Sequence, residues 1–174
     1  MHMTVRRRDG LPSFRQQRIL SLVHDLMREK NDEHFQIVHF SIQSNHIHLV
    51  SEARDRRAVT RKMQGFMIAF AKRLNAMLKR AGKVWADRYY ARDVVGSREM
   101  RNVLSYVFHN AKKHGALKKE TRLLDMFSSA VLFDGWEEKF LVYGFDDWPR
   151  PKPRTRMLRS WWRPHGLLKL AGGA

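Results

Sequence analysis

The stretch FQIVHFSIQSNHIHLV, residues 35–50, predicts two antiparallel strands and sets the fold around them. Its first half is rich in β-branched and aromatic side chains, and the link Gln43–Asn45 suits a tight turn. Side chains two residues apart in a strand point to the same face, so His46 and His48 project side by side. Ile47 and Leu49 point to the opposite face. The stretch therefore predicts a hairpin with one apolar face and one histidine face.

Further strands and helices are predicted on both sides of this hairpin. Apart from the hairpin, the predicted elements are a strand at 2–7, a helix at 13–30, a helix at 56–80, a strand at 88–95 and a helix at 97–114. Ser13 is the expected N-cap of the first helix, and Gly82 and Gly115 are the expected ends of the second and third. The first six elements form a β-α-β-β-α-β unit, the ferredoxin-like arrangement of an α+β protein. Its antiparallel sheet carries two helices on one face, and the third helix is added outside the unit.

The composition points to an anionic partner. The 174 residues include 34 Lys and Arg against 17 Asp and Glu, a formal net charge of +17 with histidine neutral. A charge this large favours nucleic acid, with an acidic membrane surface and a merely soluble basic surface as alternatives. The absence of cysteine excludes disulfides, zinc ribbons and thiol nucleophiles. No apolar run approaches the roughly 20 residues that span a bilayer, and the start lacks the apolar region of a signal peptide, so we expect a cytosolic protein.

The histidine face offers a place for a divalent ion. Two neutral imidazoles at this spacing can chelate one ion, but they fit equally well as two half-buried histidines on a polar sheet face. The helix at 97–114 carries Tyr106 and Asn110 four residues apart on the shoulder of its apolar stripe, where they can look toward the sheet. The two side chains could join His46 and His48 around an ion. Alternatively, Tyr106 packs as an ordinary boundary residue.

Three segments, in this order, resemble the single-tyrosine HUH transposases, and most of all the REP-associated tyrosine transposases. The segments are SNHIHLV at 44–50, VWADRYYAR at 84–92 and LSYVFHNAKKHG at 104–115. The matching positions are Asn45 before the His46–Ile47–His48 motif, the pair Arg88–Tyr89, Tyr106 with Asn110, and His2 with Thr4 in the first strand. The chain departs from the family where many members read Asn-Pro-Val, because Ala111 and Lys112 follow the asparagine here. The resemblance covers about residues 1–115.

The resemblance implies an HUH nuclease fold and a metal-dependent transposase that cleaves and rejoins single-stranded DNA. It implies that His46, His48 and Asn110 hold Mg²⁺ or Mn²⁺. It also implies that Tyr106 attacks a DNA phosphate and leaves a 5′-phosphotyrosine and a free 3′-OH. The expected substrate is hairpin-containing DNA. The resemblance further implies a bacterial cytoplasmic protein associated with the nucleoid, and a possible homodimer in which the tyrosine of one subunit serves the histidines of the other.

Two other functions remain alternatives on the residues. A domesticated relative would bind a DNA hairpin without cleaving it, although all four catalytic positions hold the expected residue types. An RNA-binding domain of the RRM type would need exposed aromatic side chains on its central strands. The segment IHLVSEA at 47–53 offers none, so the sequence favours the nuclease.

The basic residues supply candidate DNA contacts. The expected phosphate contacts are Arg56, Arg57, Arg61 and Lys62 on the second long helix, Arg88, and Lys112 and Lys113 after the tyrosine. We expect an HUH nuclease domain at 1–147 and a basic C-terminal tail, rich in Trp and Pro, at 148–174. In that tail Arg154, Arg156, Trp161 and Trp162 are expected to hold a single strand or hairpin, with the aromatic rings stacking on bases. A solvated tail is equally compatible with this composition.

Overall fold

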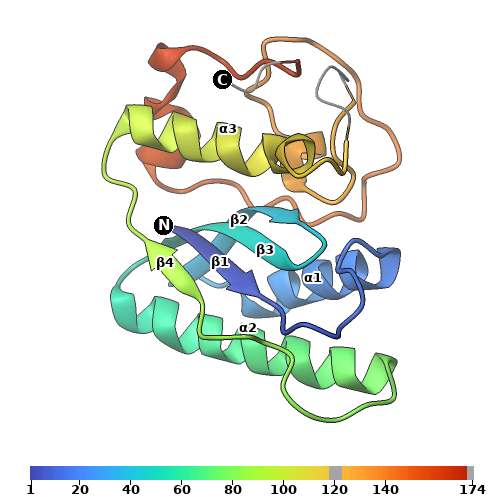
Figure 1. Ribbon diagram of the computed structural model, residues 1–174. Helices are drawn as coiled ribbons and strands as arrows, with labels where there is room; N and C mark the ends of the chain where they lie inside the picture. Colours follow the sequence, from blue (N-terminus) through green and yellow to red (C-terminus); the bar gives the residue numbers. More distant parts are fainter. Residues whose placement is uncertain (118–122, 172–174) are drawn as a thin grey trace.

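The computed structural model describes residues 1–117 and 123–171, which form one sheet with helices on both faces (Figure 1). The strands are β1 (His2–Arg6), β2 (Phe35–Ile42), β3 (His46–Ala53) and β4 (Tyr90–Arg92). The helices are α1 (Gln17–Lys30), α2 (Arg56–Met77) and α3 (Ser97–Lys113), and short helical turns follow at Ser129–Leu132, Met157–Trp161 and Arg163–His165. The predicted order of strands and helices is confirmed.

The sheet is antiparallel throughout, with the strand order β2-β3-β1-β4. This is the order of the ferredoxin-like unit, so the predicted α+β fold class is confirmed. The β2–β3 hairpin pairs Ile42 with Ile47, and the Gln43 amide donates to the carbonyl oxygen of His46 at 2.8 Å. The tight turn therefore falls where the sequence predicted it. It starts β3 at His46, so that the two histidines occupy the first and third positions of the strand.

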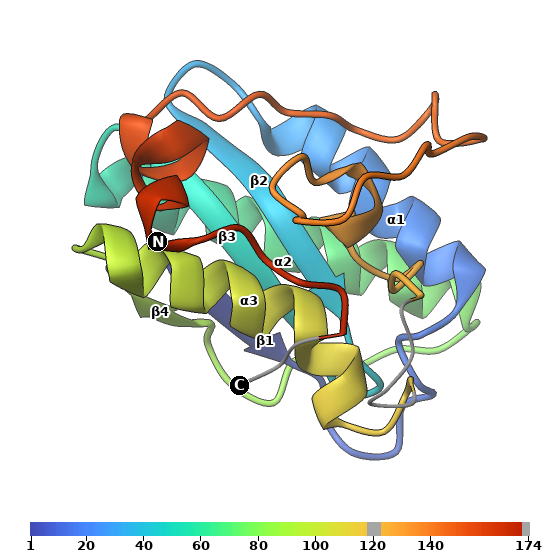
Figure 2. The same cartoon turned by 90° about the horizontal axis from the view of Figure 1, so that it is seen from above.

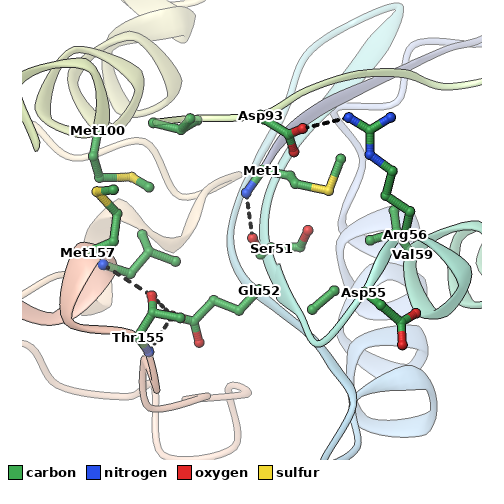
Figure 3. A pocket seen from close by; sticks show the side chains of 13 residues that line it. Met1, Ser51, Glu52, Asp55, Arg56, Val59, Asp93, Met100, Thr155 and Met157 are labelled. Carbon is green, nitrogen blue, oxygen red and sulfur yellow. Dashed lines mark hydrogen bonds and ion pairs between the residues drawn. The ribbon is translucent and has the colours of Figure 1, made fainter. Parts of the chain in front are cut away.

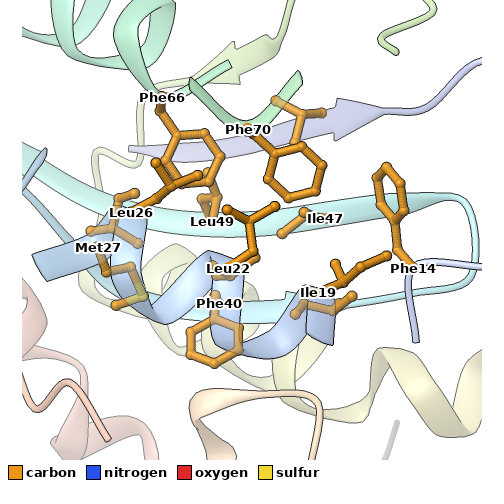
Figure 4. Close-up of a cluster of buried hydrophobic side chains, with 14 of the residues drawn as sticks. Phe14, Ile19, Leu22, Leu26, Met27, Phe40, Ile47, Leu49, Phe66 and Phe70 are labelled. Carbon is orange, nitrogen blue, oxygen red and sulfur yellow. The ribbon is translucent and has the colours of Figure 1, made fainter. Parts of the chain in front are cut away.

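The first face of the sheet packs on α1 and α2 mainly through apolar side chains (Figure 4), and the buried His24 of α1 lies against the Phe40 ring there, with the ring centroids 5.5 Å apart. Met3 and Val5 of β1 and Ile47 and Leu49 of β3 are all fully buried there. The two helices add larger side chains, among them Ile19, Leu22, Leu26, Met27, Phe66 and Phe70. The alternation along β1 and β3 thus places every second residue in this core, which fixes the strand register because a one-residue slip would bring polar residues into it.

The second face is covered by α3 and by segments from residues 123–171, which lie across the sheet in Figure 2. Val38 and Val50 of the sheet pack there against the apolar stripe of α3. The C-terminal half of the chain completes this second core with Phe133, Trp136, Leu158, Trp162, Leu168 and Leu170. Both faces of the sheet are therefore covered, and β2 is buried along its whole length.

Residues 148–171 do not form the loose tail that the sequence suggested. Trp162 has no exposed surface, and its indole Nε1 donates to the carbonyl oxygen of Leu158 at 3.0 Å. Trp148 is half-buried and packs edge-on against the ring of His24 on α1, with the ring centroids 4.5 Å apart. Apolar side chains on both sides of residue 147 therefore enter the same packed structure.

Two buried carboxylates attach the C-terminal half to the unit at 1–113. Asp125 accepts two hydrogen bonds from the Arg15 guanidinium, at 2.7 and 3.0 Å. Glu52 of β3 accepts from the backbone amides of Arg154 and Thr155, both at 2.8 Å, and from the Thr155 hydroxyl. Charge-assisted bonds of this kind fix geometry more strongly than neutral ones. These bonds hold the segments of residues 123–171, here called the second cover, against the second face of the sheet.

The element ends differ from the sequence predictions by a few residues. α1 begins at Gln17 instead of Ser13, because the Ser13 hydroxyl accepts from the Arg15 amide at 3.2 Å and so caps a turn that precedes the helix. α2 ends at Met77, and Gly82 follows in the left-handed region with φ 98°. β4 is confined to three residues. None of these shifts moves a predicted site residue to another face.

Candidate functional site

His46 and His48 stand side by side on the second face of the sheet. Their Nε2 atoms are 3.0 Å apart, and their ring centroids are 4.6 Å apart. His46 Nδ1 donates to the side-chain oxygen of Asn45 at 2.7 Å, which leaves the lone pair of His46 on Nε2. The sequence placed the pair on one face, and the structure shows that the two nitrogens converge.

β1 supplies a second layer of polar groups behind His48. Thr4 lies directly opposite His48 in the β1–β3 register, and its hydroxyl is 3.0 Å from His48 Nδ1. His2 Nε2 is 3.1 Å from the same nitrogen. Partners on the far nitrogen of an imidazole fix its tautomer and orient the ring. His2 and Thr4 therefore hold His48 with its Nε2 turned toward His46.

Burial keeps the three histidines neutral. Desolvation lowers the pKa of His2 and of His46 to about 4, with smaller contributions from the charges of Arg92 on His2 and His114 on His46. The pKa of His48 is lowered further, to about 2, because it is buried and has His46 and His2 as neighbours. Neutral imidazoles keep the lone pair that a metal ligand requires.

α3 brings Tyr106 and Asn110 over this pair. The Tyr106 ring meets the His48 ring edge-on with the centroids 5.1 Å apart, and it remains 38% exposed. Asn110 lies one turn further along and is fully buried. The ammonium of Lys113 sits 5.1 Å from the centroid of the Tyr106 ring. The shoulder position predicted for both residues therefore directs them at the histidine face.

The side-chain amide of Asn110 is buried without a hydrogen-bonding partner among the described residues. Neither its nitrogen nor its oxygen makes a hydrogen bond with any described residue, although both are buried. The amide lies close enough to His46 to oppose the lowering of the histidine pKa, without reaching the geometry of a hydrogen bond. A buried amide without partners costs about 1–3 kcal/mol, so its presence calls for a function.

These side chains fit a divalent ion. Two ligands at right angles around an octahedral ion, each about 2.1 Å from it, are about 3.0 Å apart. The Nε2 atoms of His46 and His48 are 3.0 Å apart. Within residues 1–117 and 123–171 no three His, Cys, Asp or Glu side chains form a cluster suited to a metal. The Asn110 amide, buried without a hydrogen-bonding partner, is the further oxygen-bearing group that α3 brings to the two imidazoles.

The predicted phosphate contacts on α2 lie away from Tyr106. Arg56, Arg57 and Arg61 are exposed and line one surface hollow at the start of α2. This hollow follows the C-terminal end of β3, whereas His46 is at the N-terminal end of that strand. Arg56 pairs with Asp93 at 3.0 Å, and Lys62 pairs with Asp32. The structure thus gathers the three arginines into one patch but does not bring them to the histidines.

The other predicted contacts divide into accessible and buried ones. Arg88, Lys113, Arg154 and Arg156 are exposed, and Trp161 is 48% exposed. Trp162 is enclosed in the second core, so its ring cannot stack on a base in this structure. Lys112 is also buried, and its ammonium donates to the carbonyl oxygen of Leu170. The expectations for Trp162 and Lys112 are corrected on this point, because both side chains are used in packing.

Two residues at the site had no role assigned from the sequence alone. His114 ends α3 with its ring centroid 5.5 Å from that of His46, and the spacing of four from Asn110 could have indicated it. Tyr90 is the other, and its position depends on the strand register, which the sequence does not reveal.

The hollow shown in Figure 3 is separate from this site. It has a volume of about 390 Å³ and lies between the end of β3, the start of α2 and residues 155–158. Its lining includes Glu52, Asp55 and Asp93, and the N-terminal amine of Met1 donates to the Ser51 carbonyl beside it at 2.8 Å. None of the histidine, tyrosine or asparagine side chains described above takes part in that lining.

A four-stranded antiparallel sheet, a His-hydrophobic-His strand and a helix that places a tyrosine over it define the HUH transposase fold. The family described as Transposase IS200 like matches residues 1–110, and the chain belongs to that family. The chain is similar in structure to a REP-associated tyrosine transposase bound to a REP hairpin, with a TM-score of 0.55, 18% identity and 74% of each chain covered. That likeness supports the fold. The search of curated proteins gave no match.

Among the residues described, no helix combines the length and the apolar character that crossing a membrane requires.

Proposed function

We propose that this protein cleaves and rejoins single-stranded DNA through Tyr106, with a divalent ion held by His46, His48 and Asn110. The observation that carries the proposal is the arrangement around His48. An accessible tyrosine stands 5.1 Å from this neutral imidazole, and a buried amide without partners stands one helical turn away. The ligand set of imidazoles, an amide oxygen and phosphate oxygens favours Mg²⁺ or Mn²⁺. Tyr106 lies against the histidines of its own chain, which supports attack within one subunit.

In this proposal the protein supplies a nucleophile and a fixed frame for the phosphate. The Tyr106 oxygen attacks phosphorus, and the bond to the 3′ oxygen breaks. The phenol proton is lost to solvent, and the leaving oxygen takes up a proton and becomes a free 3′-OH. The new phosphotyrosine keeps the phosphodiester energy, so a second 3′-OH can reverse the step and join another strand. Lys113 places a positive charge beside the tyrosine, where the negative phosphate must lie.

When bound, the ion would polarise a non-bridging phosphate oxygen. The remaining work falls to the protein. Thr4 and His2 orient His48, and Asn45 orients His46. Because these partners preset both rings, no reorganisation is needed at the moment of reaction.

The proposed substrate is DNA with a single-stranded or hairpin segment. Tyr106 is only partly exposed, between a helix and a sheet, where a flexible single strand fits more easily than a duplex. The net charge of +17 favours a polyanion. The structurally similar transposase was solved with a REP hairpin, which supports a hairpin as the first substrate to test.

The test is covalent adduct formation on a pool of labelled single-stranded hairpin DNAs with Mn²⁺ or Mg²⁺, resolved on a denaturing gel. We expect a shifted protein–DNA band with the wild type, none with EDTA and none with Tyr106→Phe. Tyr143→Phe is the matched control, because Tyr143 is an exposed tyrosine outside the site, and this variant should form the adduct normally. Hairpin binding without any adduct across the pool would contradict the proposal and favour a DNA-binding protein that does not cleave.

A further inference from the structure

Tyr90 lies in the same row of the sheet as His48. β4 is one of the two edge strands of the described sheet, as Figure 1 shows, and Tyr90 is paired directly with Thr4, which is paired directly with His48. Residues opposite each other in antiparallel strands project to the same face. Neighbouring strands are about 4.8 Å apart, so the backbones at Tyr90 and His48 are about 10 Å apart. The register therefore places a second tyrosine on the catalytic face, two strands from the histidine.

The fold makes no use of the Tyr90 side chain. Its ring is 66% exposed, and its hydroxyl makes no hydrogen bond with a described residue. The preceding residue, Tyr89, behaves differently and packs against the core on the first face. A large exposed ring on an edge strand adds little to stability, and an exposed aromatic face is what a nucleobase stacks on.

Positive charges lie near this row. Arg92 follows Tyr90 by two residues on the same face, lies opposite His2 and pairs with Glu99, and its charge is near enough to lower the pKa of that histidine. The Lys113 ammonium lies over Tyr106. A single strand passing over the site would thus find a cation beside Tyr106, and an exposed ring with a guanidinium close to it on β4.

We propose that Tyr90 stacks on the base of a nucleotide adjoining the scissile phosphate and so positions the strand for attack by Tyr106. This inference rests on the proposed DNA cleavage and adds the residue that holds the neighbouring nucleotide. Stacking tolerates any base, because every base presents a π-face. Tyr90 is therefore a positioning residue that fixes the path of the strand and does not read its sequence.

The test uses binding and photocrosslinking, which need no cleavage. The probe is a 20-nucleotide oligothymidine with a single 5-iododeoxyuridine, irradiated with the protein in EDTA at low salt, and the crosslinked peptide is mapped by mass spectrometry. We expect a crosslink at Tyr90. Tyr90→Leu should weaken binding of the unmodified oligonucleotide by about 5- to 150-fold, as the loss of one base–aromatic stack predicts. Tyr90→Phe, which keeps the ring, should bind like the wild type.

Tyr143→Leu is the matched control. Tyr143 is 77% exposed in the segment that leads to Trp148, which packs against α1 at the β2 side of the sheet, across from β4. This variant should keep wild-type affinity. Thermal unfolding of all variants should agree closely, because both side chains are on the surface.

The outcomes separate this inference from the proposed cleavage. Wild-type affinity in Tyr90→Leu together with no crosslink at residue 90 overturns the stacking role, even if Tyr106 forms its adduct. Failure of the wild type to bind the oligothymidine at low salt overturns it as well. A crosslink at Tyr90 with the expected loss of affinity supports it, even if no adduct forms, and in that case only the cleavage proposal fails.

Discussion

The two faces of the sheet bury different kinds of side chain. On the first face β1 and β3 contribute Met3, Val5, Ile47 and Leu49, and the helices opposite them add mostly apolar groups, with the buried His24 as a polar exception. On the second face the alternate residues of the same strands are His2, Thr4, His46 and His48. The period of two in a strand thus lets one pair of strands stabilise the fold with its odd residues and form the candidate site with its even residues.

The second face is the less favourable of the two for folding. The neutral imidazoles of His2, His39, His46 and His48 and the unpartnered amide of Asn110 are buried or half-buried there. The apolar cluster of α3 and the C-terminal half, with Trp162 at its centre, offsets this cost on the same face. Along β1 and β3, apolar and polar side chains therefore point to different faces. Within the second face, the apolar cluster and the histidines occupy different places.

Replacing Asn110 should produce the largest effect and should act in opposite directions on activity and stability. In Asn110→Leu we expect adduct formation to fall by at least about 100-fold, because the proposed third metal ligand is lost. The free energy of unfolding should rise by about 1–3 kcal/mol, because a buried amide without partners is replaced by an apolar group of the same branching. Gel-resolved adduct rates and urea denaturation measure the two effects.

The reverse exchange on the first face is the control. Leu74 of α2 is fully buried among apolar groups, so Leu74→Asn should lower the free energy of unfolding by about 3 kcal/mol or more. If Asn110→Leu also lost stability to this extent, the amide would be a structural group and the contrast between the faces would fail.

Replacing Trp162 tests whether packing of the second cover contributes to the stability of the protein. Trp162→Ala should lower the free energy of unfolding by about 3–5 kcal/mol, which is the usual cost of truncating a large buried aromatic side chain. Trp161→Ala, at the neighbouring exposed position, should change it by about 0.5 kcal/mol or less. Equal and small effects in urea denaturation would mean that residues 157–170 are only loosely attached to α3.

The sequence predicted the first 113 residues well because their periodicity is strong. The alternation at residues 46–49 identified both the apolar and the histidine face, and the helical stripe on α3 placed Tyr106 and Asn110 correctly at its shoulder. Each of these inferences is local, since it depends on the geometry of a single strand or helix.

The C-terminal half could not be predicted in this way. Leu158, Trp162 and Leu168 lie on short helical turns and irregular chain, so no period joins them, and their prolines and arginines are typical of a solvated tail. Tyr90 and Lys112 depend on long-range contacts. The position of Tyr90 follows from strand register, and Lys112 is buried because Leu170 accepts its hydrogen bond.

Acid should destabilise the second face through its histidines. His39 of β2 is packed edge-on against Phe108 and Phe133, and burial lowers its pKa to about 4. Between about pH 6.5 and pH 4 the unfolded chain therefore binds a proton at His39 that the folded chain does not. The contribution of neutral His39 to the free energy of unfolding is complete above about pH 6.5 and declines as the pH falls toward about 4. Each such histidine adds up to about 1.4 kcal/mol per pH unit to the slope.

His39→Leu measures this contribution separately from packing. The free energy of unfolding, measured by urea denaturation at several pH values, should depend less on pH between about 6.5 and 4 by up to about 1.4 kcal/mol per unit. At pH 8 both states carry a neutral residue at this position, so the difference there isolates the packing effect. An unchanged slope would mean that His39 is protonated in the folded protein.

Two adjacent lysines on α3 contrast an exposed side chain with a buried one, and their replacement should give the smallest effects. Lys113 is exposed over the Tyr106 ring, whereas Lys112 is buried, with its ammonium on the Leu170 carbonyl. Lys113→Met should weaken single-stranded DNA binding a few-fold and reduce the slope of log affinity against log salt by about 0.7, the value for one phosphate contact. Lys112→Met should leave that slope unchanged and lower the free energy of unfolding by about 1–3 kcal/mol, because a charged hydrogen bond is lost in a buried place. Fluorescence anisotropy over a salt series and urea denaturation separate the two effects. If instead Lys112→Met reduced the salt slope, Lys112 would contact phosphate. The end of α3 would then have to rotate when DNA binds, and the second cover would be part of the DNA-binding surface.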